Sequence, residues 1–180
     1  VYISFLVKRN FKIIGIDTSK PLIKNLRKNY ISKDTQAEPL VQNTLKKHKK
    51  KIIFTDDFKK LKNCNFVLIA EDVKILSDGT KDESKVNILL KRAIKNAKIN
   101  SNFIILSQVK VGFATKMFNY AKNKKKKINL LNSLDILTIG QALKDLDQKK
   151  TFIVGSKYKN LTDNKLIKSF FLKLKKKIIF

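Results

Sequence analysis

The sequence predicts an α/β fold with a doubly wound, mostly parallel sheet. Two observations carry this prediction. Short apolar runs recur along the whole chain, and such runs are typical of strands that are buried on both faces of a parallel sheet. Segments with helical apolar spacing separate these runs, and this alternation favours parallel pairing with right-handed crossovers. The 180 residues suit a single domain over 1–180 that is large enough to bury a substantial core.

The first part of the chain places a strand between two helices. Residues 2–10 look like the end of an apolar helix, which Asn10 stops by adopting a left-handed turn. An apolar strand then runs over 11–17. Thr18 and Ser19 can cap the next helix, and Pro21 suits its first turn. This helix should end near Tyr30. The apolar face of that helix is expected to contain Leu22, Ile23, Leu26 and Tyr30.

The rest of the chain continues the alternation. After a buried strand at 65–70, a polar loop with a Ser-Asp-Gly turn should occupy 71–81. A long helix to about Ala97 follows, begun by Asp82 or Ser84. The further strands are expected at 52–54, 103–107, 128–131, 151–155 and 178–180, and the further helices at 38–47, 58–61, 113–121, 141–146 and 161–174.

The formal net charge of +27 invites a nucleic-acid interpretation. Three features argue against it. Arginine, the usual bidentate partner of phosphate and guanine, occurs only at Arg9, Arg27 and Arg92, and the lysines are spread over the whole chain. The excess also comes with abundant Ile and Asn, which share A/T-rich codons with Lys. We therefore do not expect a nucleic-acid partner, and a basic nucleic-acid-binding protein is the weaker alternative.

Hydropathy and cysteine content narrow the class further. No apolar run approaches the roughly 18 residues that a membrane helix needs, so we expect no membrane partner. Cys64 is the only cysteine, which excludes an internal disulfide and a multi-cysteine metal site. We interpret it as a packing residue. A cytoplasmic location fits this cysteine usage.

The carboxylate of Asp17 lies at a position where such a group can bind a ligand. The apolar run 11–17 ends in Asp17, where the strand stops and the chain turns. In a dinucleotide-binding fold, an acid at the carboxyl end of the second strand accepts hydrogen bonds from the adenosine ribose hydroxyls. The same seven residues also fit an ordinary strand that ends in Asp.

An ordered set of short motifs extends over nearly the whole chain. The set comprises Lys12-Ile13-Ile14-Gly15-Ile16-Asp17, Glu38-Pro39-Leu40, Phe54-Thr55-Asp56-Asp57, Phe66-Val67-Leu68-Ile69-Ala70, Ser77-Asp78-Gly79-Thr80, Ile104-Ile105-Leu106-Ser107-Gln108-Val109, Gly140-Gln141-Ala142-Leu143 and Phe152-Ile153-Val154-Gly155. In this order and spacing the motifs resemble the N-terminal, NAD-binding domain of the UDP-glucose/GDP-mannose dehydrogenases. The resemblance implies a Rossmann-like fold, NAD as cofactor, a nucleotide-sugar substrate that is oxidised to a carboxylate, and a homo-oligomer for the intact protein.

The resemblance also implies roles for particular residues. The implied cofactor-binding residues are Asp17, Lys20, Ala70, Ser107 and Gln108. Lys20 is only a substitute for the family's basic side chain, whose usual position falls on Leu22. Asp135 would be the catalytic residue, because it falls where the family has a Glu that positions substrate or a catalytic water. An aspartate there reaches less far than a glutamate.

The sequence departs from the family's pattern at both ends and in two loops. The family's first strand and its Gly-x-Gly-x-x-Gly turn would precede Val1, and its catalytic cysteine and sugar-binding half would follow Phe180. The loops after Ala70 and Val109 lack the family's usual prolines. We therefore expect an incomplete domain that is inactive alone, with an inactive fragment or a decayed relative as the alternative.

Overall fold

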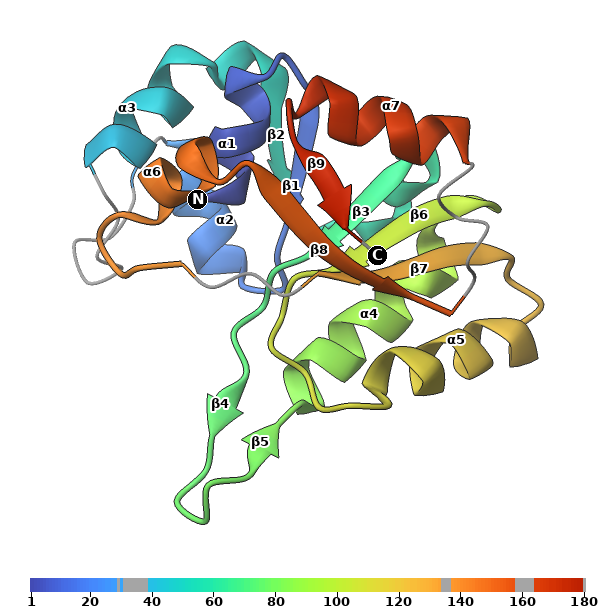
Figure 1. Ribbon diagram of the computed structural model, residues 1–180. Coiled ribbons are helices and arrows are strands. Elements are labelled where there is room, and N and C mark those ends of the chain that lie inside the picture. Colours follow the sequence, from blue (N-terminus) through green and yellow to red (C-terminus); the bar gives the residue numbers. More distant parts are fainter. Residues whose placement is uncertain (29, 31–38, 134–136, 158–163, 180) are drawn as a thin grey trace. The chain divides into compact units, whose positions relative to one another are not determined.

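The computed structural model describes residues 1–28, 30, 39–133, 137–157 and 164–179 (Figure 1). The chain divides into two compact units, each built from two segments. The first unit contains Val1–Phe58 and Ile136–Lys150, and the second contains Lys59–Asp135 and Thr151–Phe180. Each unit has parallel strands with helices packed against them, as the sequence predicts.

The first unit is built around one pair of parallel strands, β1 and β2. Its elements are α1 (Tyr2–Lys8), β1 (Ile13–Ile16), α2 (Lys20–Arg27), α3 (Pro39–Lys47), the 3-10 turn η2 (Lys49–Lys51), β2 (Ile52–Thr55) and α6 (Ala142–Gln148). Helix α1 packs on β1 and α2 packs on β2, while α3 and α6 both pack against α1. The buried core on α1 consists of Ser4, Phe5, Leu6 and Val7.

Local signals at the first helix ends are confirmed, but the extent of α2 is not. Asn10 adopts a left-handed φ of 64° after α1, and the Ser19 hydroxyl caps α2 by accepting from the backbone N–H of Leu22. Helix α2 ends at Arg27, before the expected Tyr30, because the N–H of Tyr30 turns back to the carbonyl of Asn25 (2.9 Å). Of the expected apolar face only Ile23 is buried.

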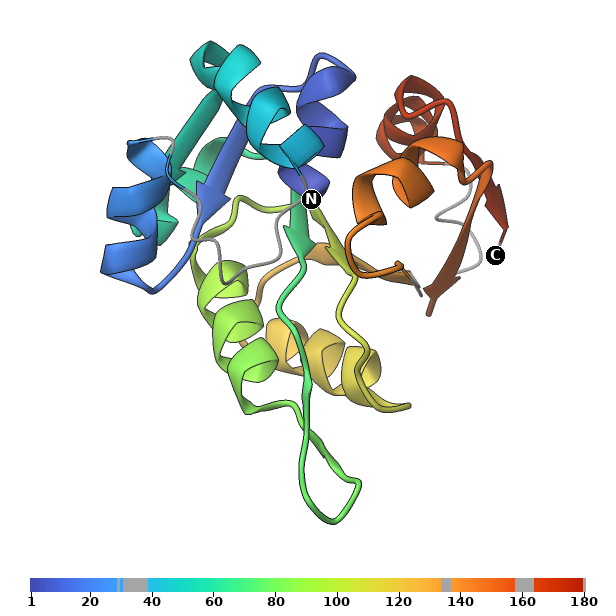
Figure 2. The ribbon, with the colours of Figure 1, turned by 90° about the vertical axis from the view of Figure 1, so that its left-hand side faces the viewer.

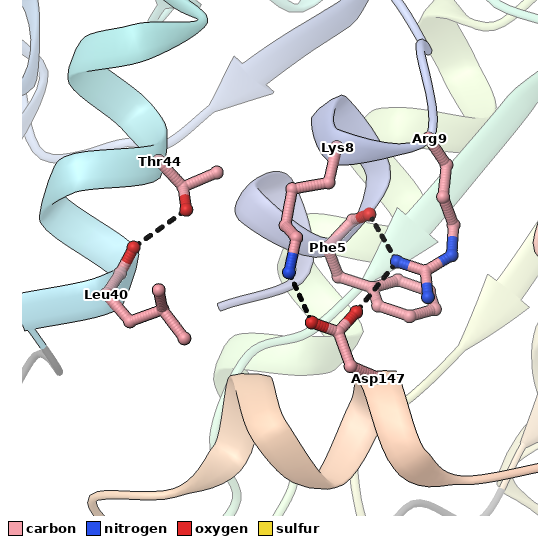
Figure 3. A network of polar contacts seen from close by, with 6 residues as sticks. All are labelled: Phe5, Lys8, Arg9, Leu40, Thr44 and Asp147. Atoms are coloured by element: carbon pink, nitrogen blue, oxygen red, sulfur yellow. Dashed lines mark hydrogen bonds and ion pairs between the residues drawn. The ribbon is translucent and has the colours of Figure 1, made fainter.

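A charged cluster fastens α6 to α1 within the first unit (Figure 3). Asp147 on α6 accepts hydrogen bonds from Lys8 and from Arg9, the latter at 2.9 Å. Arg9 also donates to the carbonyl of Phe5 at 3.0 Å and lies over the Phe5 ring, 3.8 Å from its centroid. Partial burial pushes the pKa of Asp147 upward, but the hydrogen bonds and charges of Lys8 and Arg9 outweigh it and hold the pKa below its ordinary value.

The second unit has a five-stranded sheet in the order β3-β6-β7-β8-β9. Its elements are the 3-10 helix η3 (Phe58–Asn63), which begins at the last residue of the first unit, then β3 (Phe66–Ile69), β4 (Lys74–Ile75), β5 (Lys81–Asp82), α4 (Ser84–Asn96), β6 (Ser101–Ile105), α5 (Phe113–Asn123), β7 (Ile128–Ser133), β8 (Thr151–Ser156), α7 (Lys165–Lys173) and β9 (Lys177–Ile179). Strands β3, β6 and β7 pair in parallel, and β9 pairs in parallel with β8. The mostly parallel sheet is therefore confirmed.

Helices cover both faces of this sheet (Figures 1 and 2). Helices α4 and α5 lie side by side on one face, and α7 lies on the other. On the α7 face, Phe170 stacks on Phe66 with ring centroids 4.2 Å apart, and Phe171 meets Phe152 edge to face at 5.8 Å. All five residues of β6 are buried, as a strand in the middle of a covered sheet should be.

Three local predictions are wrong. The stretch expected to be a loop at 71–81 forms, together with Asp82, an antiparallel hairpin of β4 and β5, which extends beyond the N-terminal end of α4 (Figures 1 and 2). The expected Ser-Asp-Gly turn is present between its strands. The helix expected at 58–61 is the 3-10 helix η3. Strands β7 and β8 pair antiparallel, because residues 137–150, which contain α6, belong to the first unit and form no crossover helix on this sheet.

Within the described ranges, no helix is long and apolar enough to cross a membrane.

Candidate functional site

Asp17 lies at the carboxyl end of β1, in the first unit. Its backbone N–H donates to the carbonyl of Thr55 at 3.3 Å, so the parallel ladder with β2 extends one residue past β1. The Asp17 Oδ1 accepts from the N–H of Ser19 at 2.7 Å, which closes a tight turn into α2. In the described part of the chain, no hydrogen bond is formed by Oδ2. The half-buried carboxylate therefore keeps an acceptor for a ligand at a strand end.

The N-terminus of α2 follows directly. Ser19 is its N-cap and Pro21 occupies its first turn, as the sequence predicts. Lys20 is the first helical residue and is exposed. Leu22, at the position where the resembled family has a base, is 38% exposed. Asp17 and Lys20 are thus on the same short turn between strand and helix.

A second set of predicted residues lies at one edge of the second unit's sheet. Because Ile69 of β3 is paired with Ile105 of β6, the carboxyl ends of the two strands meet at the same edge. Ala70 directly follows β3 and is exposed. Ser107 is buried, and its hydroxyl donates to the carbonyl of Ile69 at 3.4 Å. The structure therefore brings Ala70 and Ser107 together.

Gln108 begins the loop 108–112 between β6 and α5. Its side chain is exposed, and its backbone carbonyl accepts a hydrogen bond of 2.9 Å from Lys81 Nζ at the base of the hairpin. The carboxylate of Glu83 accepts from the N–H of Lys110 in the same loop. The loop ends at Gly112, whose φ of 88° lies in the region that favours glycine.

Sequence reasoning missed the contacts of Lys81 and Glu83. It gave Asp82 or Ser84 as the start of α4, and the structure shows that α4 begins at Ser84, whose N–H donates to Asp82 Oδ1 at 2.9 Å. Hydrogen bonds from the hydroxyl and from the backbone N–H of Ser84 hold the pKa of Asp82 below its ordinary value. The only sequence signal for Lys81 and Glu83 is the run of three charged residues Lys-Asp-Glu at a helix start. Periodicity carries no information on which loop such side chains reach.

The third parallel strand, β7, ends at Ser133. Ser133 is buried, and its hydroxyl donates to the carbonyl of Ile153 on β8 at 3.1 Å. The predicted catalytic residue, Asp135, lies outside the described residues. Its expected role stays a prediction.

Cys64 lies before β3, away from the carboxyl ends of the strands. Burial raises the pKa of its thiol, although the positive charge of Lys98 opposes this. The thiol donates weakly to the carbonyl of Lys60 at 3.9 Å. A protonated, half-buried thiol suits the packing role that the sequence indicated.

Together these features define a dinucleotide-binding α/β domain. Parallel strands with helices packed against them build each unit, as in the halves of a doubly wound fold. The candidate residues in both units follow the carboxyl ends of strands, where ligands bind in open α/β sheets.

Comparison with known proteins identifies the family. Residues 1–174 match the UDP-glucose/GDP-mannose dehydrogenase family, NAD binding domain, and the chain belongs to that family. Its cofactor is accordingly NAD. No curated protein sequence matches the chain.

Solved structures show the same fold. The chain is similar to GDP-mannose dehydrogenase from Pseudomonas aeruginosa (20% identity, TM-score 0.82) and to UDP-D-ManNAc dehydrogenase from Pyrococcus horikoshii (18%, 0.83). It is also similar to a UDP-glucose dehydrogenase from Pyrobaculum islandicum (16%, 0.79). In each case the match covers 98% of this chain and 42% of the other, so the chain spans about two fifths of these enzymes.

Proposed function

We propose that the chain is the NAD-binding portion of a nucleotide-sugar 6-dehydrogenase of the UDP-glucose type, which oxidises a sugar CH–OH to a carboxylate. One observation carries the proposal. Asp17 presents a carboxylate oxygen without a hydrogen bond in the described part of the chain, at the carboxyl end of a parallel strand, in a chain whose family domain binds NAD. Such an oxygen matches the donors of the adenosine ribose, so the residues present fit the cofactor.

The proposed roles follow from the placement of each residue. Asp17 Oδ2 accepts from the ribose hydroxyls, and the exposed Lys20 offers a positive charge one turn further on. Ser107 and Gln108 border the nicotinamide end, because they follow a strand of the second half of the fold. Bound NAD supplies the hydride acceptor.

The remaining proposals concern the intact protein. Asp135 positions the substrate or a catalytic water, as the glutamate at its position does in the resembled family. A homo-oligomer is proposed for the intact protein on the same resemblance. A cytoplasmic location is supported by the single cysteine.

A turnover assay tests the proposal. The full-length gene product that contains these residues is mixed with NAD and, in turn, UDP-glucose, GDP-mannose and UDP-ManNAc. We expect NADH formation with one of them, at two NADH for each carboxylate formed, since the conversion removes four electrons. Replacing Asp135 by Ala should lower kcat without weakening NAD binding. A gene product that binds NAD but turns over no nucleotide sugar contradicts the proposed reaction, and a decayed relative then accounts for it better.

A further inference from the structure

Two charged side chains of the second unit hold the loop 108–112 at separate points. Lys81 Nζ donates to the carbonyl of Gln108 at 2.9 Å, and the Glu83 carboxylate accepts from the N–H of Lys110. A cation thus holds a carbonyl and an anion holds an N–H two residues further on. Both hydrogen bonds are charge-assisted, which makes them stronger than neutral ones.

The direction of the Glu83 side chain is not explained by its own helix. Glu83 is the N-cap residue of α4, yet its side chain makes no capping hydrogen bond. Asp82 serves the N-terminus of α4, by accepting from the N–H of Ser84. The side chain of Asp82 therefore caps the N-terminus of α4, whereas the side chains of Lys81 and Glu83 form hydrogen bonds with the loop 108–112.

The loop has little backbone bonding of its own to fix it. Within the loop, the N–H of Val109 donates to the carbonyl of Ser107 at 2.8 Å. The carbonyl of Lys110 accepts from the N–H of Phe113 at 3.2 Å. The carbonyl of Gln108 and the N–H of Lys110 have their described hydrogen bonds only with the two charged side chains. These contacts therefore orient two of the loop's peptide groups.

We infer that Lys81 and Glu83 are positioning residues that hold Ser107 and Gln108 in place for the nicotinamide end of the cofactor. The inference rests on the proposed function, in which the loop after β6 borders the nicotinamide end of NAD. The residue proposed for the adenosine end, Asp17, belongs to the first unit. Loss of the hydrogen bonds from Lys81 or Glu83 to the loop should therefore weaken binding of the nicotinamide end and leave binding of the adenosine end unchanged.

Calorimetric titration with two ligands distinguishes binding of the nicotinamide end from binding of the adenosine end. NAD carries both, whereas ADP-ribose lacks the nicotinamide. In the full-length gene product, Lys81→Met should weaken NAD binding by about tenfold and leave ADP-ribose within about twofold. Lys81→Arg keeps a cationic donor and should restore most of the affinity for NAD. Glu83→Gln should act in the same direction as Lys81→Met, more weakly, because the amide oxygen still accepts.

The matched control is Lys116→Met on α5, an exposed lysine that follows the same loop and makes no described side-chain contact. It loses the same charge and should leave both affinities within about twofold. A second readout is amide hydrogen exchange without ligand, which should rise at Lys110 in Glu83→Gln and not in the control.

The outcomes distinguish the two proposals. If the unmodified gene product binds neither ligand, the proposed function fails and the inference with it. If NAD binds and Lys81→Met weakens both ligands equally, or neither, only the positioning role is overturned. Selective loss for NAD, rescued by Lys81→Arg, supports the inference.

Discussion

Arg9 Nη1 and Asp147 Oδ1 lie 2.9 Å apart, although 138 residues of sequence separate them. Lys8 occupies the other carboxylate oxygen (Figure 3). The side chains of Arg9 and Asp147 are only 17% and 27% exposed, so water screens this pair less than a surface pair. The segment that returns from β7 is thereby fastened to the first helix of the chain.

Removing this carboxylate should destabilise the first unit. We expect Asp147→Ala to lower the free energy of unfolding by about 1–2 kcal/mol, because Arg9 then keeps a half-buried charge without this carboxylate. Urea unfolding measures the change. The ion pair of Glu71 with Lys85, whose lysine is 66% exposed, provides the control: Glu71→Ala should change stability by at most about 0.5 kcal/mol. Equal effects of the two substitutions would show that the buried pair is worth no more than the exposed one.

The same carboxylate should make stability depend on acid pH. The folded pKa of Asp147 is lowered, so its contribution is fully present above the unfolded value of about 3.9 and is lost as pH falls through the lower folded value. The stability gap between the parent chain and Asp147→Asn should thus be constant from about pH 7 to 5 and shrink below about pH 4. Chemical unfolding at a series of pH values tests this. A gap that widens in acid would reverse the sign and refute the assignment.

A glycine in β1 is needed for packing. A Cβ on Gly15 would meet the ring of Phe54 at 2.8 Å and the side chain of Ile3 at 3.0 Å. We expect Gly15→Ala to lower the free energy of unfolding by about 1–3 kcal/mol, since the core must shift to admit the methyl group. Gly155→Ala on β8 is the control, because its nearest contact is a carbonyl oxygen at 3.8 Å. A tolerated Gly15→Ala would mean that Phe54 repacks freely.

Nucleic-acid binding should be weak despite the charge of +27. Of the three arginines, Arg9 is engaged with Asp147 and Arg27 donates to the carbonyl of Phe54 at 2.9 Å. At about 150 mM salt we expect affinity for duplex DNA no tighter than the non-specific range of about 10⁻⁴–10⁻⁶ M. Fluorescence anisotropy over a salt series is the measurement. Nanomolar binding with a steep salt slope would revive the nucleic-acid alternative.

Much of the fold could be predicted from the sequence because its signals are local. The apolar run that became β6 is buried on both faces, and that of β3 is fully buried on one face. Asn10 and Ser19 act at helix ends as their chemistry requires. The hairpin of β4 and β5 was missed because each strand has two polar-flanked residues and no period to detect.

What could not be predicted depends on contacts between distant segments. The antiparallel pairing of β7 with β8 follows from where residues 137–150 pack, and the sequence gives no period for that. In the candidate site, too, local features could be predicted and contacts between distant segments could not. Asp17 was identified by its place at a strand end, whereas the reach of Lys81 and Glu83 to the loop 108–112 needed coordinates.

The affinity of Asp17→Asn for NAD tests the central claim most directly. Asparagine keeps an oxygen for the N–H of Ser19, so the turn into α2 should survive, but the charged acceptor for the ribose is lost. In calorimetric titration of the full-length gene product we predict about tenfold weaker binding of NAD. Asp78→Asn, in the exposed hairpin turn, is the matched control and should bind as the parent does. An Asp17→Asn affinity within about twofold of the parent would contradict the ribose role, and with it our account of the cofactor site.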